Sequence, residues 1–340
     1  MKKRILITGA SGTVGINTIN NLIDNKDVEL TLFDLNTPRA KKRLKPYRDK
    51  ARIVWGDISE KNALIPACMN QDVVIHLAAI IPPMAEDYPP LAYKVNVIGT
   101  KNLIDLLEML SPQAHIIYAS SVAVYGDRLK NPWISTTDPL KPSEGDEYGK
   151  TKIIAENLIR ASSLTWTIMR LSAVFGVKNH KISKMLFHMP LDTPIEIITP
   201  EDAGRAFARA ALNTDKIKNR IFNLGGGEKA RILYKDFLDR SFRIFGLGGL
   251  DFPPQAFAKR NFHCGYFKDS NELEAILHFQ QDDIETYFKR VEASVTIIQK
   301  FFTYLFHKMI KASLLKKSEP LKALKNGDKK LMKRFFGLTD

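Results

Sequence analysis

Short apolar runs alternate with segments of helical periodicity over the first 175 residues of the chain. The apolar runs predict strands at residues 5–8, 29–33, 53–55, 73–77, 115–119 and 165–170. The periodic segments predict helices at residues 15–24, 92–110 and 148–162. Because alternating strands and helices build parallel sheets covered on both faces, the predicted fold class is α/β, with a doubly wound parallel sheet.

The second half of the chain is less regular. Residues 178–283 mix short helices with the turns Gly225-Gly226-Gly227 and Gly248-Gly249 and with Pro253-Pro254. We predict that they form a smaller C-terminal lobe, interleaved with the first domain. Residues 284–340 read as helix followed by a lysine-rich segment, which predicts a basic amphipathic helical tail.

A glycine-punctuated turn joins the first predicted strand to the first predicted helix, as Thr8-Gly9-x-x-Gly12-x-x-Gly15. Glycines at this spacing let the backbone approach a pyrophosphate, and the N-terminus of the following helix favours negative charge. Residues 1–177 are therefore predicted to form a Rossmann-type domain that binds a dinucleotide. The residues expected at the phosphates are Gly9, Ser11, Gly12, Thr13, Val14 and Gly15.

An acidic residue after the second predicted strand bears on the choice of cofactor. Asp34 lies 19 residues beyond Gly15. A carboxylate there accepts hydrogen bonds from the ribose hydroxyls and repels a 2′-phosphate, which favours NAD over NADP. Arg39 and the basic run Lys41-Lys42-Arg43 leave NADP open as the less favoured cofactor.

A tyrosine and a lysine four residues apart lie in the predicted helix at 148–162. Tyr148 and Lys152 would share one face of that helix. A secondary alcohol gives up a hydride only if its hydroxyl proton also leaves, and tyrosine, with a pKa of about 10, is ordinarily a poor base. The ammonium of Lys152 and a cationic nicotinamide would favour the phenolate. Ser121 is expected to orient the substrate oxygen, with Ser120 as the alternative.

Together, these motifs resemble the extended short-chain dehydrogenase/reductase family, in its NAD-dependent epimerase/dehydratase group. The resemblance covers about residues 3–285, and the motifs occur in the family's order. They stand at residues 8–15, 56–58, 76–79, 95–100, 120–126, 148–152 and 222–227.

The resemblance implies that Ser121, Tyr148 and Lys152 are the catalytic triad. It further implies cofactor contacts at Asp57, Ile58, Leu77, Ala78, Ala79, Asn96, Ser120, Tyr148 and Lys152. The alternative for His76 and Asn96 is that they are packing or strand-end residues.

Some positions depart from the family's motifs, and these departures reduce the number of reactions that we expect. Val122 and Ala123 stand where sugar 4,6-dehydratases of the family carry an acidic pair, so dehydration by that route is not expected. Ala173 stands where epimerases commonly carry an asparagine for the nucleotide sugar, and the segment before Asp202 lacks the phosphate-binding arginine. The basic residues that could still meet a diphosphate are Lys259 and Arg260.

These features predict an NAD-dependent oxidoreductase or epimerase that oxidises a secondary alcohol to a ketone, with Tyr148 as the base. One alternative is a nucleotide-sugar 4-epimerase in cell-surface glycan synthesis. The other is a non-catalytic NAD-binding sensor or scaffold, which the complete serine, tyrosine and lysine set argues against. The resemblance also implies a homodimer, formed through a four-helix bundle of residues 92–110 and 148–162.

The net charge of +14 is concentrated at the C-terminus. Residues 300–340 hold 11 basic and 3 acidic residues, which weakens any nucleic-acid role for the rest of the chain. Phenylalanine, leucine and methionine recur there near helical spacing. We expect this apolar face to pack on the body or on a second subunit, or else to contact an anionic membrane surface.

The compartment is predicted from cysteine usage and from the N-terminus. Cys68 and Cys264 are far apart and form no CxxC pattern, so neither a disulfide framework nor a metal site is expected. A reducing, cytoplasmic location fits this usage, with peripheral membrane contact through the tail. The basic and apolar start of the chain is too short for a signal peptide and is expected to be the first strand.

Overall fold

A seven-stranded parallel sheet forms the centre of the molecule. The computed structural model describes residues 2–177 and 184–338. The strand order is β10-β7-β5-β4-β1-β2-β3, and every pairing in it is parallel. The strands are β1 (Lys3–Thr8), β2 (Val28–Asp34), β3 (Arg52–Trp55), β4 (Val73–His76), β5 (His115–Ser121), β7 (Thr165–Leu171) and β10 (Arg220–Leu224). All six predicted strands are present, and β10 joins the sheet from the second half of the chain.

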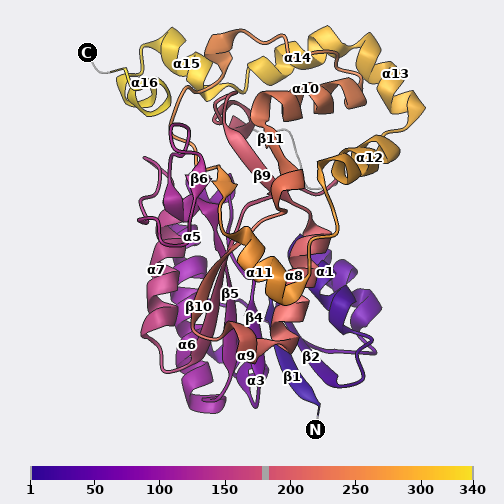
Figure 1. Ribbon diagram of the computed structural model, residues 1–340, viewed down its shortest axis with the longest axis vertical. Coiled ribbons are helices and arrows are strands. Elements are labelled where there is room, and N and C mark those ends of the chain that lie inside the picture. The colour runs from indigo at the N-terminus through magenta and orange to yellow at the C-terminus, as the bar shows by residue number, and fades with distance from the viewer. Residues whose placement is uncertain (1, 178–183, 339–340) are drawn as a thin grey trace.

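Helices cover both faces of the sheet, which confirms the doubly wound α/β fold (Figure 1). One apolar core lies between the sheet and α1 (Thr13–Leu22), α8 (Pro200–Leu212) and α11 (Ser270–Leu277). The other lies beneath α3 (Lys61–Cys68), α6 (Gly99–Leu110) and α7 (Glu147–Ala161). The shorter helices are α2 (Pro38–Leu44), α4 (Met84–Asp87), α5 (Pro89–Tyr93) and α9 (Thr214–Ile217).

The predicted helix at 92–110 is interrupted. It begins within α5, passes through a π-helical turn at Lys94–Ile98 and continues as α6. A π-helical turn is typical of functional sites, and this one carries Asn96.

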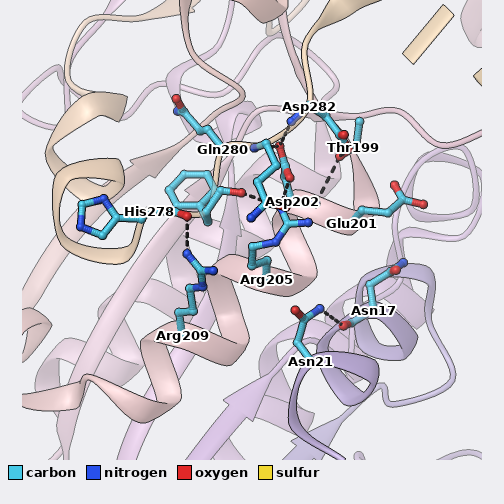
Figure 2. Close-up of polar contacts among 12 residues, drawn as sticks. Asn17, Asn21, Thr199, Glu201, Asp202, Arg205, Arg209, His278, Gln280 and Asp282 are labelled. Atoms are coloured by element: carbon cyan, nitrogen blue, oxygen red, sulfur yellow. Dashed lines mark hydrogen bonds and ion pairs between the residues drawn. The ribbon is translucent and has the colours of Figure 1, made fainter. Parts of the chain in front are cut away.

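Helix α8 packs closely on α1 because Gly204 has no side chain. A Cβ at Gly204 would lie 2.4 Å from the Cβ of Asn17. The start of α8 is tied to the segment that follows α11 by the buried carboxylate of Asp202 (Figure 2). Its partners are the main-chain N–H groups of Gln281 and Asp282, at 3.0 and 2.9 Å, and the guanidinium of Arg205. The structure therefore shows Asp202 as a packing residue.

A smaller lobe lies beyond the carboxyl ends of the sheet strands (Figure 1). It holds a three-stranded sheet of β8 (Ala173–Val174), β9 (Pro194–Ile198) and β11 (Arg231–Leu233), with α10 (Tyr234–Phe245) and α12 (Ile284–Ser294). A second pair, β6 (Trp133–Ile134) and β12 (Tyr266–Phe267), is parallel. The lobe's aromatic core includes Phe187, Phe237, Phe257, Tyr287 and Phe288. The predicted start of the lobe at residue 178 lies outside the described residues, and the domain limits stay a prediction.

In the described part of the tail, α12 is followed by four short helices. They are α13 (Ile297–Leu305), α14 (His307–Leu315), α15 (Glu319–Asn326) and α16 (Lys329–Phe336). Leu314, Ala323 and Phe335 are buried, so packing on the body is observed for α14 to α16. Helix α13 has no buried residue. Within residues 2–177 and 184–338, none of the helices combines the length and apolar character needed to cross a bilayer.

Candidate active site at the carboxyl edge of the sheet

The glycine turn after β1 has no room for a side chain at Gly9 or Gly15. Gly9 has a φ of +67°, and a Cβ there would lie 2.8 Å from the main chain of Ala78. A Cβ at Gly15 would lie 2.6 Å from the carbonyl oxygens of Gly9 and Ala10. The turn leads directly into α1, so its N–H groups and the helix N-terminus lie together. This arrangement fits the pyrophosphate of a dinucleotide.

The structure brings the predicted ribose-binding acid to this turn. The Oδ2 atom of Asp34 accepts a hydrogen bond from the N–H of Ser11 at 2.6 Å. At the end of the neighbouring strand β3, Asp57 accepts hydrogen bonds from the N–H and hydroxyl of Ser59, at 2.9 and 2.8 Å. Ile58 is buried beneath Gly99. These residues line the side of the sheet where the adenosine half of NAD is predicted.

The residues after β4 lie against the glycine turn from the other side. The N–H of Ala78 donates to the hydroxyl of Thr8 at 3.3 Å, while the N–H of Leu77 donates to the carbonyl oxygen of Thr8 at 3.2 Å. Ala79 follows in the same loop and is half-buried. The loop and the turn therefore form adjacent walls of one region.

His76 and Asn96 are both engaged in packing contacts. Burial lowers the pKa of His76 to about 3, and its ring nitrogens contact the hydroxyls of Thr8 and Thr100 at 2.8 and 2.9 Å. Asn96 accepts from the N–H of Ile80 at 2.7 Å and donates to its carbonyl at 2.9 Å. These contacts agree with packing roles for both side chains, and a cofactor contact at Asn96 stays a prediction.

The three predicted catalytic residues lie together. Tyr148 is in the first turn of α7, which is capped by Asp146 through a 2.7 Å hydrogen bond from the N–H of Gly149. Ser121 ends β5, and its side chain lies near enough to the Tyr148 hydroxyl to oppose the rise in the pKa of that group. The Nζ atom of Lys152 lies 5.6 Å from the centroid of the Tyr148 ring.

Burial shifts the pKa values of Tyr148 and Lys152 in opposite directions. It raises the pKa of Tyr148 above its ordinary range, and the hydrogen bond from Ser121 opposes that effect. Burial also lowers the pKa of Lys152 to about 7, against an opposing effect of Glu156. A lysine that titrates near neutral pH, beside a tyrosine in a sheet-edge site, is typical of acid–base catalysis.

Ser120 faces a different direction from Ser121. It is buried, and its hydroxyl donates to the Oε1 atom of Glu156 at 2.5 Å. Glu156 also forms a two-pronged ion pair with Arg170, with N–O distances of 2.9 and 2.7 Å. The structure thus brings Ser121, rather than Ser120, to Tyr148.

Sequence reasoning missed the pair of Glu156 and Arg170. A usable signal was present, because Glu156 follows Lys152 by four residues and so continues the face that carries Tyr148. The position of Arg170, on β7 beside β5, follows only from the strand order.

A buried hydrogen-bonded chain leads from this pair to the lobe. The guanidinium of Arg170 donates to the Tyr125 hydroxyl at 2.8 Å, and that hydroxyl donates to Asn223 at 2.8 Å. Asn223 donates to Asp269 at 2.7 Å, and Asp269 accepts from the N–H of Thr136 at 2.6 Å. The catalytic helix is therefore connected to the segment after β12 through side chains alone.

The basic residues considered for a diphosphate lie beside the tail. The N–H of Lys259 donates to the carbonyl of Phe335 at 2.8 Å. The guanidinium of Arg260 lies 2.9 Å from where a Cβ on Gly337 would be. In the part of the chain that the structure describes, this places both next to the end of α16.

Replacing Lys152 with methionine is expected to stabilise the fold at neutral pH. The ordinary pKa of this lysine is 10.5 and the folded value is about 7, so the unfolded chain binds more protons between them. The stability of the parent protein therefore rises with pH in this window, by up to about 1.4 kcal/mol per unit. The variant lacks that rise, so its advantage shrinks from pH 7 to pH 10. Urea unfolding of both proteins across this range measures it, and a constant difference would contradict the prediction.

Comparison with known proteins adds three findings. The NAD dependent epimerase/dehydratase family matches residues 5–225. A 3-beta-hydroxysteroid dehydrogenase of Mycolicibacterium neoaurum is 30% identical over 206 residues, which cover 57% of this chain and 54% of the relative. The N-acetyl-alpha-D-glucosaminyl-diphospho-ditrans,octacis-undecaprenol 4-epimerase of Escherichia coli O157:H7 is 32% identical over 187 residues, covering 53% and 51%. The chain thus spans about half the length of these curated relatives.

A solved structure shows the same fold. The UDP-glucuronic acid 4-epimerase of Bacillus cereus, in complex with UDP-glucuronic acid and NAD, aligns with a TM-score of 0.67 at 20% identity. The alignment covers 85% of this chain and 99% of the epimerase. The sheet order, the glycine turn and the matched residues agree, and the chain belongs to the NAD-dependent epimerase/dehydratase family.

Proposed function

We propose that this chain is an NAD-dependent oxidoreductase that oxidises a secondary alcohol to a ketone. The observation that carries this proposal is the Nζ atom of the buried Lys152, which lies 5.6 Å from the centroid of the Tyr148 ring, with Ser121 at the end of β5. Bound NAD supplies the acceptor for the hydride that leaves the carbinol carbon. Ser121 holds the substrate oxygen, and Tyr148 as phenolate takes its proton.

Two features of the protein favour a phenolate at Tyr148, and one nearby charge disfavours it. The residue lies in the first turn of α7, where the helix dipole favours negative charge. Lys152, when protonated, adds a positive charge one helical turn away. Both effects oppose the burial that raises the pKa of Tyr148, whereas the carboxylate of Asp146 adds to that rise.

The glycine turn and Asp34 support NAD as the cofactor. The turn offers main-chain N–H groups at the start of α1, and Asp34 lies within 2.6 Å of the Ser11 N–H. In this proposal, the turn binds the pyrophosphate and Asp34 binds the adenosine ribose. The family's dependence on NAD and the NAD held by the solved relative agree with this assignment.

An apolar or lipid-linked alcohol is the substrate class that we propose. Val122 and Ala123 directly follow Ser121 and bring no acid to an elimination step. Ala173 offers no amide to a nucleotide sugar. The two curated relatives are named for a hydroxysteroid and for a sugar diphosphate on a polyprenol, and both are lipids.

A 4-epimerase is the second candidate. It is favoured by the two relatives named as 4-epimerases, one acting on a lipid-linked sugar and one solved with a nucleotide sugar. In that reaction, Tyr148 would return the proton after the ketone turns in the site. A non-catalytic NAD-binding sensor is disfavoured, because Ser121, Tyr148 and Lys152 are all present and in contact range.

A homodimer in the cytoplasm, with a membrane surface as a further partner, completes the proposal. Apolar side chains are exposed along α5, α6 and α7, among them Leu91 at 40%, Met109 at 66% and Ile154 at 37%. Two copies of these helices could bury that surface as a four-helix bundle. The membrane contact is assigned to the tail.

The test is formation of NADH by purified protein given NAD and a panel of alcohols. The panel holds 3β-hydroxysteroids, other apolar secondary alcohols and UDP-sugars, and products are also examined for isomers of unchanged mass. Net NADH from an apolar alcohol is the expected result. An isomer formed from a UDP-sugar without net NADH would establish the epimerase instead. NAD binding with no turnover of any class would favour the sensor.

A further inference from the structure

Helix α13 carries its apolar side chains outward. Ile297 is 88% exposed, Phe301 61% and Tyr304 67%, whereas the polar Thr303 is half-buried. An amphipathic helix on a globular protein ordinarily turns its apolar stripe toward the core. In α13 the stripe faces the solvent, and a polar position lies toward the protein.

Exposed apolar side chains continue from α13 into the start of α14. We call this surface the outer patch; it consists of Ile297, Ile298, Phe301, Phe302, Tyr304, Leu305, Phe306 and Met309, each at least 46% exposed. It lies at the edge of the lobe, away from the central sheet (Figure 1). Exposed apolar surface of this kind marks an interaction site on a soluble protein.

The patch is held on a structured support. A capping box formed by Thr296 and Gln299 begins α13. On the other side, the Nζ atom of Lys311 donates to the carbonyl of Gly249 at 2.7 Å, and the Ser318 hydroxyl donates to the carbonyl of Ala256 at 2.6 Å. Helix α13 therefore begins at a defined cap, and the chain that follows it is held on the lobe at Lys311 and Ser318.

The charged residues in the segment that carries the outer patch are all basic. Residues 293–318 contain five lysines and no acidic residue. Lys311 is used inside the lobe, whereas Lys300, Lys308, Lys316 and Lys317 are exposed. A surface that combines exposed aromatic residues with lysines is complementary to anionic lipid headgroups above an apolar layer.

A groove opens along the inner margin of the patch. It has a volume of about 440 Å³ and lies between α13 and the end of α10. Its lining includes the apolar Ile297, Phe301 and Tyr304 and the cationic Arg243 and Lys300. Cations beside an apolar channel suit a headgroup phosphate together with part of an acyl chain.

We infer that α13 and the start of α14 dock this protein on an anionic lipid bilayer. The apolar side chains of the outer patch enter the boundary between headgroups and acyl chains, while the lysines contact phosphates. A second copy is the poorer occupant, because a two-fold contact would bring the lysines of both copies together without acidic partners. The inference does not depend on the reaction proposed above.

The test compares binding of the full-length protein to two kinds of vesicle. One is phosphatidylcholine alone, and the other contains about one third phosphatidylglycerol. Sedimentation should show binding to the anionic vesicles, weakened by salt. The double variant Phe301→Ser/Leu305→Ser should bind roughly tenfold or more weakly. The matched control Ile65→Ser/Met69→Ser, which alters exposed apolar residues on α3 and the turn after it, should bind like the parent.

NAD affinity and the mass of the protein without vesicles complete the experiment. Unchanged NAD affinity in both double variants would show that they are folded. Equal binding to both kinds of vesicle, or binding that survives the Phe301 and Leu305 changes, would overturn the inference. So would a change from dimer to monomer in that variant, because the patch would then be a contact between copies. A dimer that all variants retain agrees with a separate interface on α6 and α7.

Discussion

Replacing Tyr148 with phenylalanine is expected to lower kcat by about 10²- to 10⁴-fold. The change removes one oxygen atom, the one that accepts the substrate proton in the proposed reaction. The ring remains, so the packing of the first turn of α7 is retained. NAD affinity should change little, because the glycine turn and Asp34 are untouched. Steady-state kinetics with the substrate found in the alcohol panel, together with NAD titration, measures both quantities.

Tyr93→Phe is the matched control for this variant. Tyr93 ends α5 and is 48% exposed, so loss of its hydroxyl should leave kcat and NAD affinity unchanged. If Tyr148→Phe turned over at the parent rate, Tyr148 would not be the base. If it lost NAD affinity as well as turnover, the defect would be in binding and the assignment would also fail.

The second large effect is expected from the buried pair of Glu156 and Arg170. Arg170→Met should lower the free energy of unfolding by about 3–5 kcal/mol, because it leaves a buried carboxylate without its positive partner. Glu156→Leu should have a similar cost, since it leaves a buried guanidinium. The double variant should cost less than the sum of the two, because no uncompensated charge remains. Urea unfolding followed by circular dichroism gives the three values.

An exposed ion pair serves as the control for the buried pair of Glu156 and Arg170. Lys101 and Asp105 form an ion pair at 2.8 Å on the surface of α6. Removing either partner there should cost only about 0–1 kcal/mol, because water replaces the lost contact. Additive costs at Glu156 and Arg170, or costs as small as those at Lys101 and Asp105, would mean that the buried pair contributes little to stability.

Local sequence patterns predicted six of the seven strands of the central sheet, and there is a physical reason why the seventh was missed. The six predicted strands are rich in Ile, Leu, Val and aromatic residues, as a sheet buried on both faces requires. The strand at Arg220–Leu224 was not predicted, because it is separated by about fifty residues from β7, the strand with which it pairs. The tail was expected to be helical, and it is, but its division into four helices depends on caps such as Ser318 and Asp328.

In the site, too, the relation between nearby residues was predicted from the sequence, whereas contacts between residues far apart in the chain were not. The four-residue spacing of Tyr148 and Lys152 is enough to place them on one helix face. The choice between Ser120 and Ser121 was not decided by spacing, since either residue could face the helix. The structure places the Ser120 hydroxyl on Glu156, and this depends on how α7 packs across β5.

By itself, the sequence determined the fold class, the glycine turn and the tyrosine–lysine pair, because each of these follows from short-range rules of periodicity and backbone geometry. The tertiary structure alone decided the partner of Ser120, the chain from Arg170 to Asp269 and the orientation of α13. These features join residues that are tens of positions apart, and the pattern of a helix shows that it has an apolar face but not which way that face points. In α13 the apolar face points outward, and only the placement of the helix on the lobe shows it.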